Sequence, residues 1–131
     1  MSLIYTCDVQ IIKKKKIANK VFIYEKSNRH IKIIKRLKLK GKVIKNLGEG
    51  VRNSHLIILC TPMSSYKSLI LKINKYLTSN HIITDLGSSK KESFNIIKKY
   101  LKKNIFWTSS HPIAGSEVSG PEYGTEDLFK N

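Results

Sequence analysis

The chain has 131 residues, of which 40% are hydrophobic and 26% are charged, and its formal net charge is +16 at pH 7. This length fits one domain that is large enough to bury a core, and the composition excludes a disordered chain. No apolar run reaches the roughly 18–20 residues of a membrane-spanning helix, and the early charges are in the wrong order for a secretory signal. We therefore expect a cytoplasmic protein without a membrane partner.

Short apolar runs alternate along the chain with longer amphipathic stretches. Residues 21–24 predict a strand that is followed by Glu25. A cap at Ser27 or Asn28 then begins a helix, and Gly41 is expected to end it.

The middle of the chain repeats this alternation. Residues 43–44 predict a brief strand, and the five apolar residues 56–60 predict a strand buried on both faces, ended by residues 61–62. Ser64 or Ser65 then begins a second helix. Its expected apolar side consists of Leu69, Ile70, Ile73 and Leu77.

The last third predicts two more strands around a helix. Residues 82–84 form a strand that ends at residues 85–87, a helix covers residues 89–101, and residues 105–107 form the last strand. Residues 109–123 are rich in Gly, Ser and Pro and predict a loop. The side chains expected to point inward from the helix are Phe94, Ile97 and Leu101.

Strands that alternate with amphipathic helices predict an α/β fold with a doubly wound parallel sheet, in which ligands bind at the carboxyl ends of the strands. The polar residues of interest fall at those ends. The two cysteines lie in no metal or disulfide spacing, so we interpret both as reduced thiols, with Cys60 buried. His30, His55 and His81 are expected to be surface or capping residues, and we predict no metal site.

Glu25 follows a strand and precedes a helix. An acidic side chain at that place in a dinucleotide-binding fold accepts hydrogen bonds from the adenosine ribose and favours NAD over NADP. Lys26 and Arg29 lie close in sequence and weaken this preference, which leaves NADP open. The alternative is a solvated glutamate that binds nothing.

Two further segments carry candidate chemistry. Residues 84–90 form a strand-to-helix turn whose N–H groups and hydroxyls suit an anion or a ribose, although Ser88 or Ser89 could equally be a plain cap. Residues 110–122 hold His111 among small residues, where a neutral imidazole can accept a proton from a substrate hydroxyl. The alternative is a histidine that only braces the loop.

These segments resemble the prephenate/arogenate dehydrogenase family, and the resemblance covers essentially the whole chain. The specific matches are residues 84–90, residues 111–117, residues 119–122 and residues 127–129. Residues 56–62 look like that family's strand that ends beside the cofactor.

The resemblance implies a Rossmann-like domain and NAD(P)-dependent oxidative decarboxylation of prephenate or arogenate in tyrosine biosynthesis. His111 would take the proton of the ring hydroxyl, and Ser88 would bridge the imidazole, substrate and nicotinamide. Which of the two substrates is used stays open. By the same resemblance, Gly115, Ser116 and Glu117 would line the substrate mouth, Lys90 would brace the turn, and the cofactor would lie against Glu25, Thr61, Pro62, Asp85, Gly87 and Ser88.

The sequence departs from this family at both ends. When the chain is aligned with the family's GxGxxG turn, Ser2 and Tyr5 fall at the second and third glycine positions. The first strand and the glycine-rich turn are therefore expected to be missing or degraded. Without this central strand, its neighbours would keep unpaired backbone groups, so we expect an unstable monomer unless residues 3–7 replace it. We expect residues 1–131 to be a partial dinucleotide-binding domain that lacks the family's helical dimerisation domain.

Three hypotheses follow from the sequence. The chain is a fragment of an enzyme of this family, an inactive remnant of such an enzyme, or a basic nucleic-acid-binding protein that reuses the fold. The lysines spread along the whole chain, which favours the first two hypotheses over the third.

Overall fold

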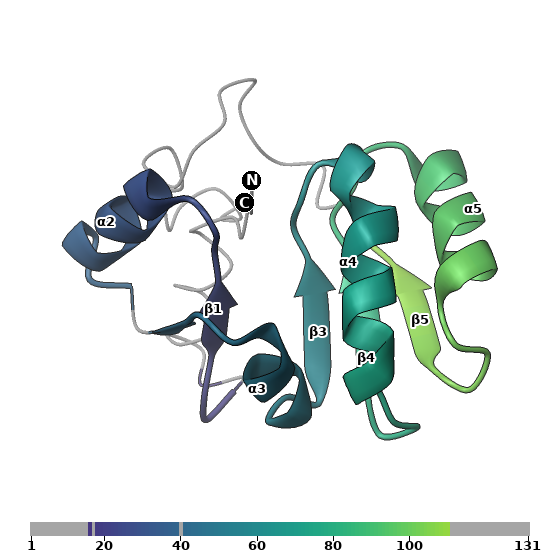
Figure 1. Cartoon of the computed structure of the whole chain (residues 1–131), viewed down its shortest axis with the longest axis horizontal. Helices are drawn as coiled ribbons and strands as arrows, with labels where there is room; N and C mark the ends of the chain where they lie inside the picture. Colours follow the sequence, from purple (N-terminus) through teal and green to yellow (C-terminus); the bar gives the residue numbers. More distant parts are fainter. Residues whose placement is uncertain (1–15, 17, 40, 111–131) are drawn as a thin grey trace. The chain divides into compact units, whose positions relative to one another are not determined.

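The structure is a computed structural model, and it describes residues 16, 18–39 and 41–110 (Figure 1). The chain divides into two compact units, one formed by residues 1–45 and 113–131 and the other by residues 46–112. The predicted loss of the first strand and of the glycine-rich turn lies outside the described residues.

The first unit contains a helix between two parallel strands. β1 pairs with β2 in parallel, with Ile23 opposite Val43. Ser27 caps the helix as predicted, because its side chain accepts a hydrogen bond from the His30 backbone N–H at 3.3 Å. The elements are β1 (Phe22–Tyr24), α2 (Asn28–Arg36) and β2 (Lys42–Ile44).

The prediction that Gly41 ends the helix is wrong. α2 ends at Arg36, and the backbone N–H of Leu37 closes its last turn on the carbonyl of Ile33. Lys38 follows with a positive φ of 49°. Gly41 instead permits close packing, because a Cβ there would lie 2.7 Å from Cδ1 of Ile23.

The second unit is built on three parallel strands in the order β3-β4-β5. Leu59, Asp85 and Ser109 lie opposite one another at the carboxyl ends of these strands. The elements are α3 (Leu47–Arg52), β3 (Leu56–Leu59), a 3₁₀ turn (Met63–Ser65), α4 (Tyr66–Ile73), a 3₁₀ turn (Asn74–Tyr76), β4 (Ile82–Asp85), α5 (Lys90–Tyr100) and β5 (Phe106–Ser109).

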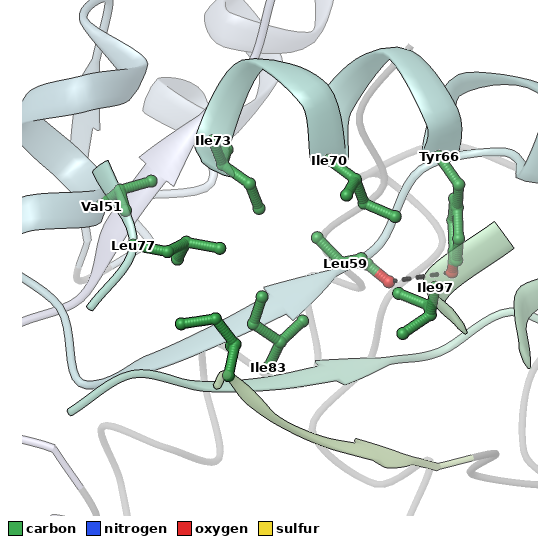
Figure 2. Close-up of a cluster of buried hydrophobic side chains, with 9 residues drawn as sticks. Val51, Leu59, Tyr66, Ile70, Ile73, Leu77, Ile83 and Ile97 are labelled. Atoms are coloured by element: carbon green, nitrogen blue, oxygen red, sulfur yellow. Dashed lines mark hydrogen bonds between the residues drawn. The ribbon is translucent and has the colours of Figure 1, made fainter. Parts of the chain in front are cut away.

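Helices α4 and α5 bury the main core against one face of this sheet. Figure 2 shows Tyr66, Ile70 and Ile73 of α4 pointing toward Leu59 and Ile83 of the strands. Ile70 and Ile73 belong to the predicted apolar side of this helix, whereas Tyr66 was not predicted to lie there. The Tyr66 hydroxyl donates to the Leu59 carbonyl at 3.3 Å, which satisfies a polar group inside the core. Cys60 is buried as predicted.

The burial of three side chains differs from the prediction. Leu56 is 50% exposed and Ile82 is 43% exposed, so the first residues of β3 and β4 are not buried on both faces. Phe94 is 48% exposed, and its ring lies 6.0 Å from that of Trp107 rather than in the core. Alternate strand residues point to opposite faces, and α4 and α5 cover the face that carries Ile83.

Helix α3 was not predicted, and His81 ties it to the sheet. His81 is 6% exposed, so it is not a surface residue. Its Nδ1 accepts the Thr78 backbone N–H at 2.9 Å, which leaves the proton on Nε2, 3.0 Å from the carbonyl of Val51 in α3. The histidine therefore caps the turn before β4 and holds the carboxyl end of α3.

Replacing this histidine should destabilise the fold. His81→Leu leaves the Val51 carbonyl without its donor and is expected to lower the free energy of unfolding by about 1–3 kcal/mol. The measurement is urea denaturation followed by circular dichroism. The matched control is His55→Leu at an exposed position, and equal losses in the two variants would contradict the role of His81.

Candidate functional site

A buried carboxylate lies at the carboxyl end of the middle strand. Asp85 is 0% exposed. Its Oδ2 accepts the backbone N–H of Gly87 at 3.2 Å and the ammonium of Lys90 at 3.1 Å. Lys90 is the first residue of α5, so the pair fixes the turn that joins β4 to this helix. The expectation that Lys90 braces the turn fits this geometry.

Lys90 also reaches the end of the next strand. Its ammonium donates to the backbone carbonyl of Ser110, the residue that follows β5. The Ser110 hydroxyl and backbone N–H approach the Asp85 carbonyl at 3.0 and 3.2 Å, and its hydroxyl lies 2.9 Å from that of Thr84. Ser110 is thereby held to both β4 and α5.

Gly87 leaves room for a neighbouring tyrosine. A Cβ at this position would lie 2.8 Å from Sδ of Met63 and 2.9 Å from the hydroxyl oxygen of Tyr66. Tyr66 is fully buried, so it has little freedom to retreat. The glycine predicted in the cofactor turn therefore has a packing role.

Two polar atoms at the same edge have no hydrogen-bond partner among the described residues. They are Oγ1 of Thr61, just beyond β3, and Oδ1 of Asp85. Both atoms are buried, and buried polar groups in proteins are normally satisfied. A polar ligand at this edge, or an ordered water, would supply what they lack.

Glu25 occupies the carboxyl end of β1 in the first unit. It is 4% exposed, so it is not the solvated glutamate of the alternative interpretation. Its Oε1 accepts the Ser27 backbone N–H at 2.7 Å, and its Oε2 lies 3.4 Å from Nδ1 of His30. His30 is therefore engaged with a carboxylate, whereas we expected it to be a surface or capping residue.

The other predicted residues are divided between described and undescribed parts of the chain. Pro62 is partly buried and Ser88 is exposed at the β4–α5 turn. His111, Gly115, Ser116 and Glu117 lie outside the described residues. The proposed convergence of His111 with Ser88 is therefore still a prediction.

Two tyrosine rings of the second unit have cationic side chains beside them. Lys67 and Lys99 lie 5.2 and 5.4 Å from the ring centroid of Tyr100. Although burial raises the pKa of Tyr100, the hydrogen bond from Lys67 and the charges of both lysines outweigh it and lower this pKa. Arg52 and Lys75 cover Tyr76 in the same way. Cationic side chains therefore lie beside both of these rings.

Two kinds of site are absent from the described ranges. No group of three or more His, Cys, Asp or Glu side chains is placed there to hold a metal ion. None of the helices there is long and apolar enough to cross a membrane.

Comparison with known proteins gives consistent matches. Residues 9–131 match the family model described as prephenate dehydrogenase, nucleotide-binding domain. A cyclohexadienyl dehydrogenase of Zymomonas mobilis is 30% identical over 111 residues, which cover 85% of this chain and 38% of that protein.

Solved structures agree in fold. The prephenate dehydrogenase from Aquifex aeolicus superposes with a TM-score of 0.80 at 22% identity, over 94% of this chain and 44% of that one. The same enzyme in complex with hydroxyphenyl propionate and NAD+ gives 0.75 at 21% identity, over 95% and 43%. The chain thus has a Rossmann-like fold and spans less than half the length of these proteins.

The contact between Gly87 and Tyr66 can be tested by substitution. Gly87→Ala inserts a methyl group against the buried tyrosine and is expected to cost about 1–3 kcal/mol of unfolding free energy. In a Tyr66→Phe background the hydroxyl is absent, so the same substitution should cost less. Urea denaturation of the four proteins measures both costs, and equal costs would exclude the hydroxyl contact as the cause.

Proposed function

The chain belongs to the prephenate dehydrogenase family, whose nucleotide-binding domain it matches over residues 9–131, and from this we propose that it binds NAD at the carboxyl ends of its strands. We propose further that it is the cofactor-binding part of an enzyme that oxidatively decarboxylates prephenate or arogenate in the cytoplasm. The chain spans only part of its relatives, so the substrate and the dimer partner belong to this proposal.

The observation that carries the proposal is the unsatisfied polarity at the strand ends. Oγ1 of Thr61 and Oδ1 of Asp85 lack partners among the described residues at the edge where parallel α/β sheets bind ligands. The turn from β4 to α5 adds the exposed Ser88 and the first backbone N–H groups of a helix. These groups fit the amide, hydroxyl and phosphate groups of a dinucleotide.

Glu25 supplies the ribose contact in this proposal. A carboxylate offers about four lone-pair sites, and the contacts to Ser27 and His30 use at most two of them. The remaining sites can accept two ribose hydroxyls. The negative charge disfavours the extra phosphate of NADP, while Lys26 and Arg29 are exposed beside it and reduce that discrimination.

His111 and Ser88 act on the substrate in this proposal. A nicotinamide held at this edge would supply the acceptor for the hydride that leaves the substrate carbon, which is the cofactor's own chemistry. His111 takes the proton of the hydroxyl on that carbon, and Ser88 donates a hydrogen bond that orients the hydroxyl. Gly115, Ser116 and Glu117 line the substrate entrance, while Asp85, Gly87 and Pro62 shape the turns that face the cofactor.

An inactive remnant is the competing candidate, because Ser2 and Tyr5 replace glycines of the phosphate-binding turn. Loss of those glycines weakens the approach of backbone N–H groups to the pyrophosphate. The two candidates differ in one measurable property, the affinity for NAD.

Glu25→Gln tests the cofactor site. NAD should quench Trp107 fluorescence in the unsubstituted chain, and the substitution should weaken NAD binding about tenfold because a charge-assisted hydrogen bond is lost. Binding of NADP should improve relative to NAD. The control is Glu92→Gln at an exposed position of α5. A flat NAD titration of the unsubstituted chain at millimolar concentration would favour the remnant.

His111→Asn tests the proton acceptor. Turnover of prephenate or arogenate should fall by about 10²–10⁴-fold, the usual contribution of a general base, with NAD affinity unchanged. Absorbance of NADH measures turnover, and His55→Asn is the matched control. Turnover retained by the His111 variant would remove this residue from the proton-transfer role.

A further inference from the structure

The first unit places a histidine against the carboxylate that is proposed to bind the ribose. The side chain of Glu25 is 1% exposed, and its Oε2 lies 3.4 Å from Nδ1 of His30. This nitrogen is buried and makes no hydrogen bond with any described residue. The contact is therefore one of charge, and it attracts in full when the imidazole is protonated.

His30 stands where a helix normally favours acidic side chains. The N-terminus of a helix carries partial positive charge, so basic groups in its first turn are unfavourable. The first turn of α2 nevertheless contains no acidic residue and includes Arg29 and His30. Glu25 supplies the missing negative charge from the end of β1, because its Oε1 accepts the Ser27 backbone N–H at 2.7 Å. One buried carboxylate thus serves both the helix end and the histidine.

The charge on this carboxylate decides how the site receives a phosphate. NADP carries a phosphate where NAD has a ribose hydroxyl, and a carboxylate repels that phosphate while a nearby arginine accommodates it. A protonated His30 would offset the charge of Glu25. The exposed Lys26 and Arg29 and the start of α2 would then attract the phosphate.

His30 is the one histidine in the described part of the first unit. Histidine ordinarily changes its charge between pH 5 and 8, whereas lysine, arginine and tyrosine ordinarily do not. Besides Glu25, the other titratable side chains described in this unit are all of those three types. They are Lys16, Lys20, Tyr24, Lys26, Arg29, Lys32, Lys35, Arg36, Lys38, Lys42 and Lys45.

We propose that His30 is a specificity-determining residue, and that its protonation offsets the charge of Glu25 and admits the phosphate of NADP. The inference rests on the proposed function, because it concerns which dinucleotide that site takes. The neutral imidazole leaves the carboxylate unopposed and favours NAD. The protonated imidazole should raise the affinity for NADP relative to NAD about tenfold, which is the order of effect of one charge close to a phosphate.

The test compares the unsubstituted chain, His30→Gln and the control His55→Gln, an exposed position of the second unit. Quenching of Trp107 gives the affinities for NAD and NADP at about pH 6 and pH 8, and groups that act on both cofactors alike cancel in their ratio. The NADP phosphate itself gains a proton near pH 6, so the difference between variants is decisive. The unsubstituted chain and His55→Gln should show the rise toward pH 6, and His30→Gln should lose most of it. A rise retained by His30→Gln would overturn the inference.

His30→Lys supplies the rescue. A permanent cation beside Glu25 should hold the relative affinity for NADP high at both pH values, a result that a merely structural role of His30 would not give. A ratio in His30→Lys that matches His30→Gln at both pH values would count against the charge pair. If the His30 variants unfold, as circular dichroism would show, the histidine is a determinant of stability and the specificity role is rejected.

The pair can also be tested without a cofactor. In isotope-labelled protein, Glu25→Gln should move the NMR signals of the His30 ring nitrogens more than Glu92→Gln does, and equal shifts would overturn the inference. NAD binding with a ratio that is the same at both pH values would reject the role of His30 and leave the proposed function intact. An unsubstituted chain that binds neither cofactor would overturn the proposed function and the specificity role together.

Discussion

The buried carboxylate of Asp85 is the constraint on which the rest of the site depends. A fully buried ionised group requires both a counter-charge and hydrogen-bond donors, since its transfer from water costs several kcal/mol. Lys90 and the N–H of Gly87 supply these contacts to Oδ2, while Oδ1 has no partner among the described residues. The contacts to Oδ2 fix where α5 begins and how the chain turns after β4.

The position of β4 in the sheet extends this constraint to its neighbours. β4 lies between β3 and β5, so the residues after it contact both strands. The Leu86 backbone N–H donates to the Leu59 carbonyl at 3.1 Å, and that of Ser110 donates to the Asp85 carbonyl at 3.2 Å. The carboxyl ends of three strands are thus joined by main-chain hydrogen bonds. A ligand at this edge meets a surface that is already ordered.

The sequence was sufficient to predict the strands, but not every burial or every helix. Apolar runs identified β1, β3 and β4 because they are short, rich in β-branched or aromatic residues and bounded by polar or turn-forming residues. They could not tell that Leu56 and Ile82 point away from the helices, because a continuous apolar run hides the two-residue period of a strand. Helix α3 has six residues and includes two glycines, which argue against a helix.

A local signal for α3 was nevertheless present: Asn46 caps it and Glu49 follows three residues later. The contact of Lys90 with Ser110 carried no such signal, because Ser110 lies 20 residues away and only the folded sheet brings the two residues together. The net charge of +16 also says little about function, because it does not tell where in the fold each lysine lies. An exposed lysine near an opposite charge contributes about 0–1 kcal/mol, and solvent also weakens the Lys90–Asp85 pair, because the Lys90 side chain is 34% exposed. The other described lysines are exposed, whereas Lys90 faces a fully buried carboxylate, so its location is more informative about function than the total charge.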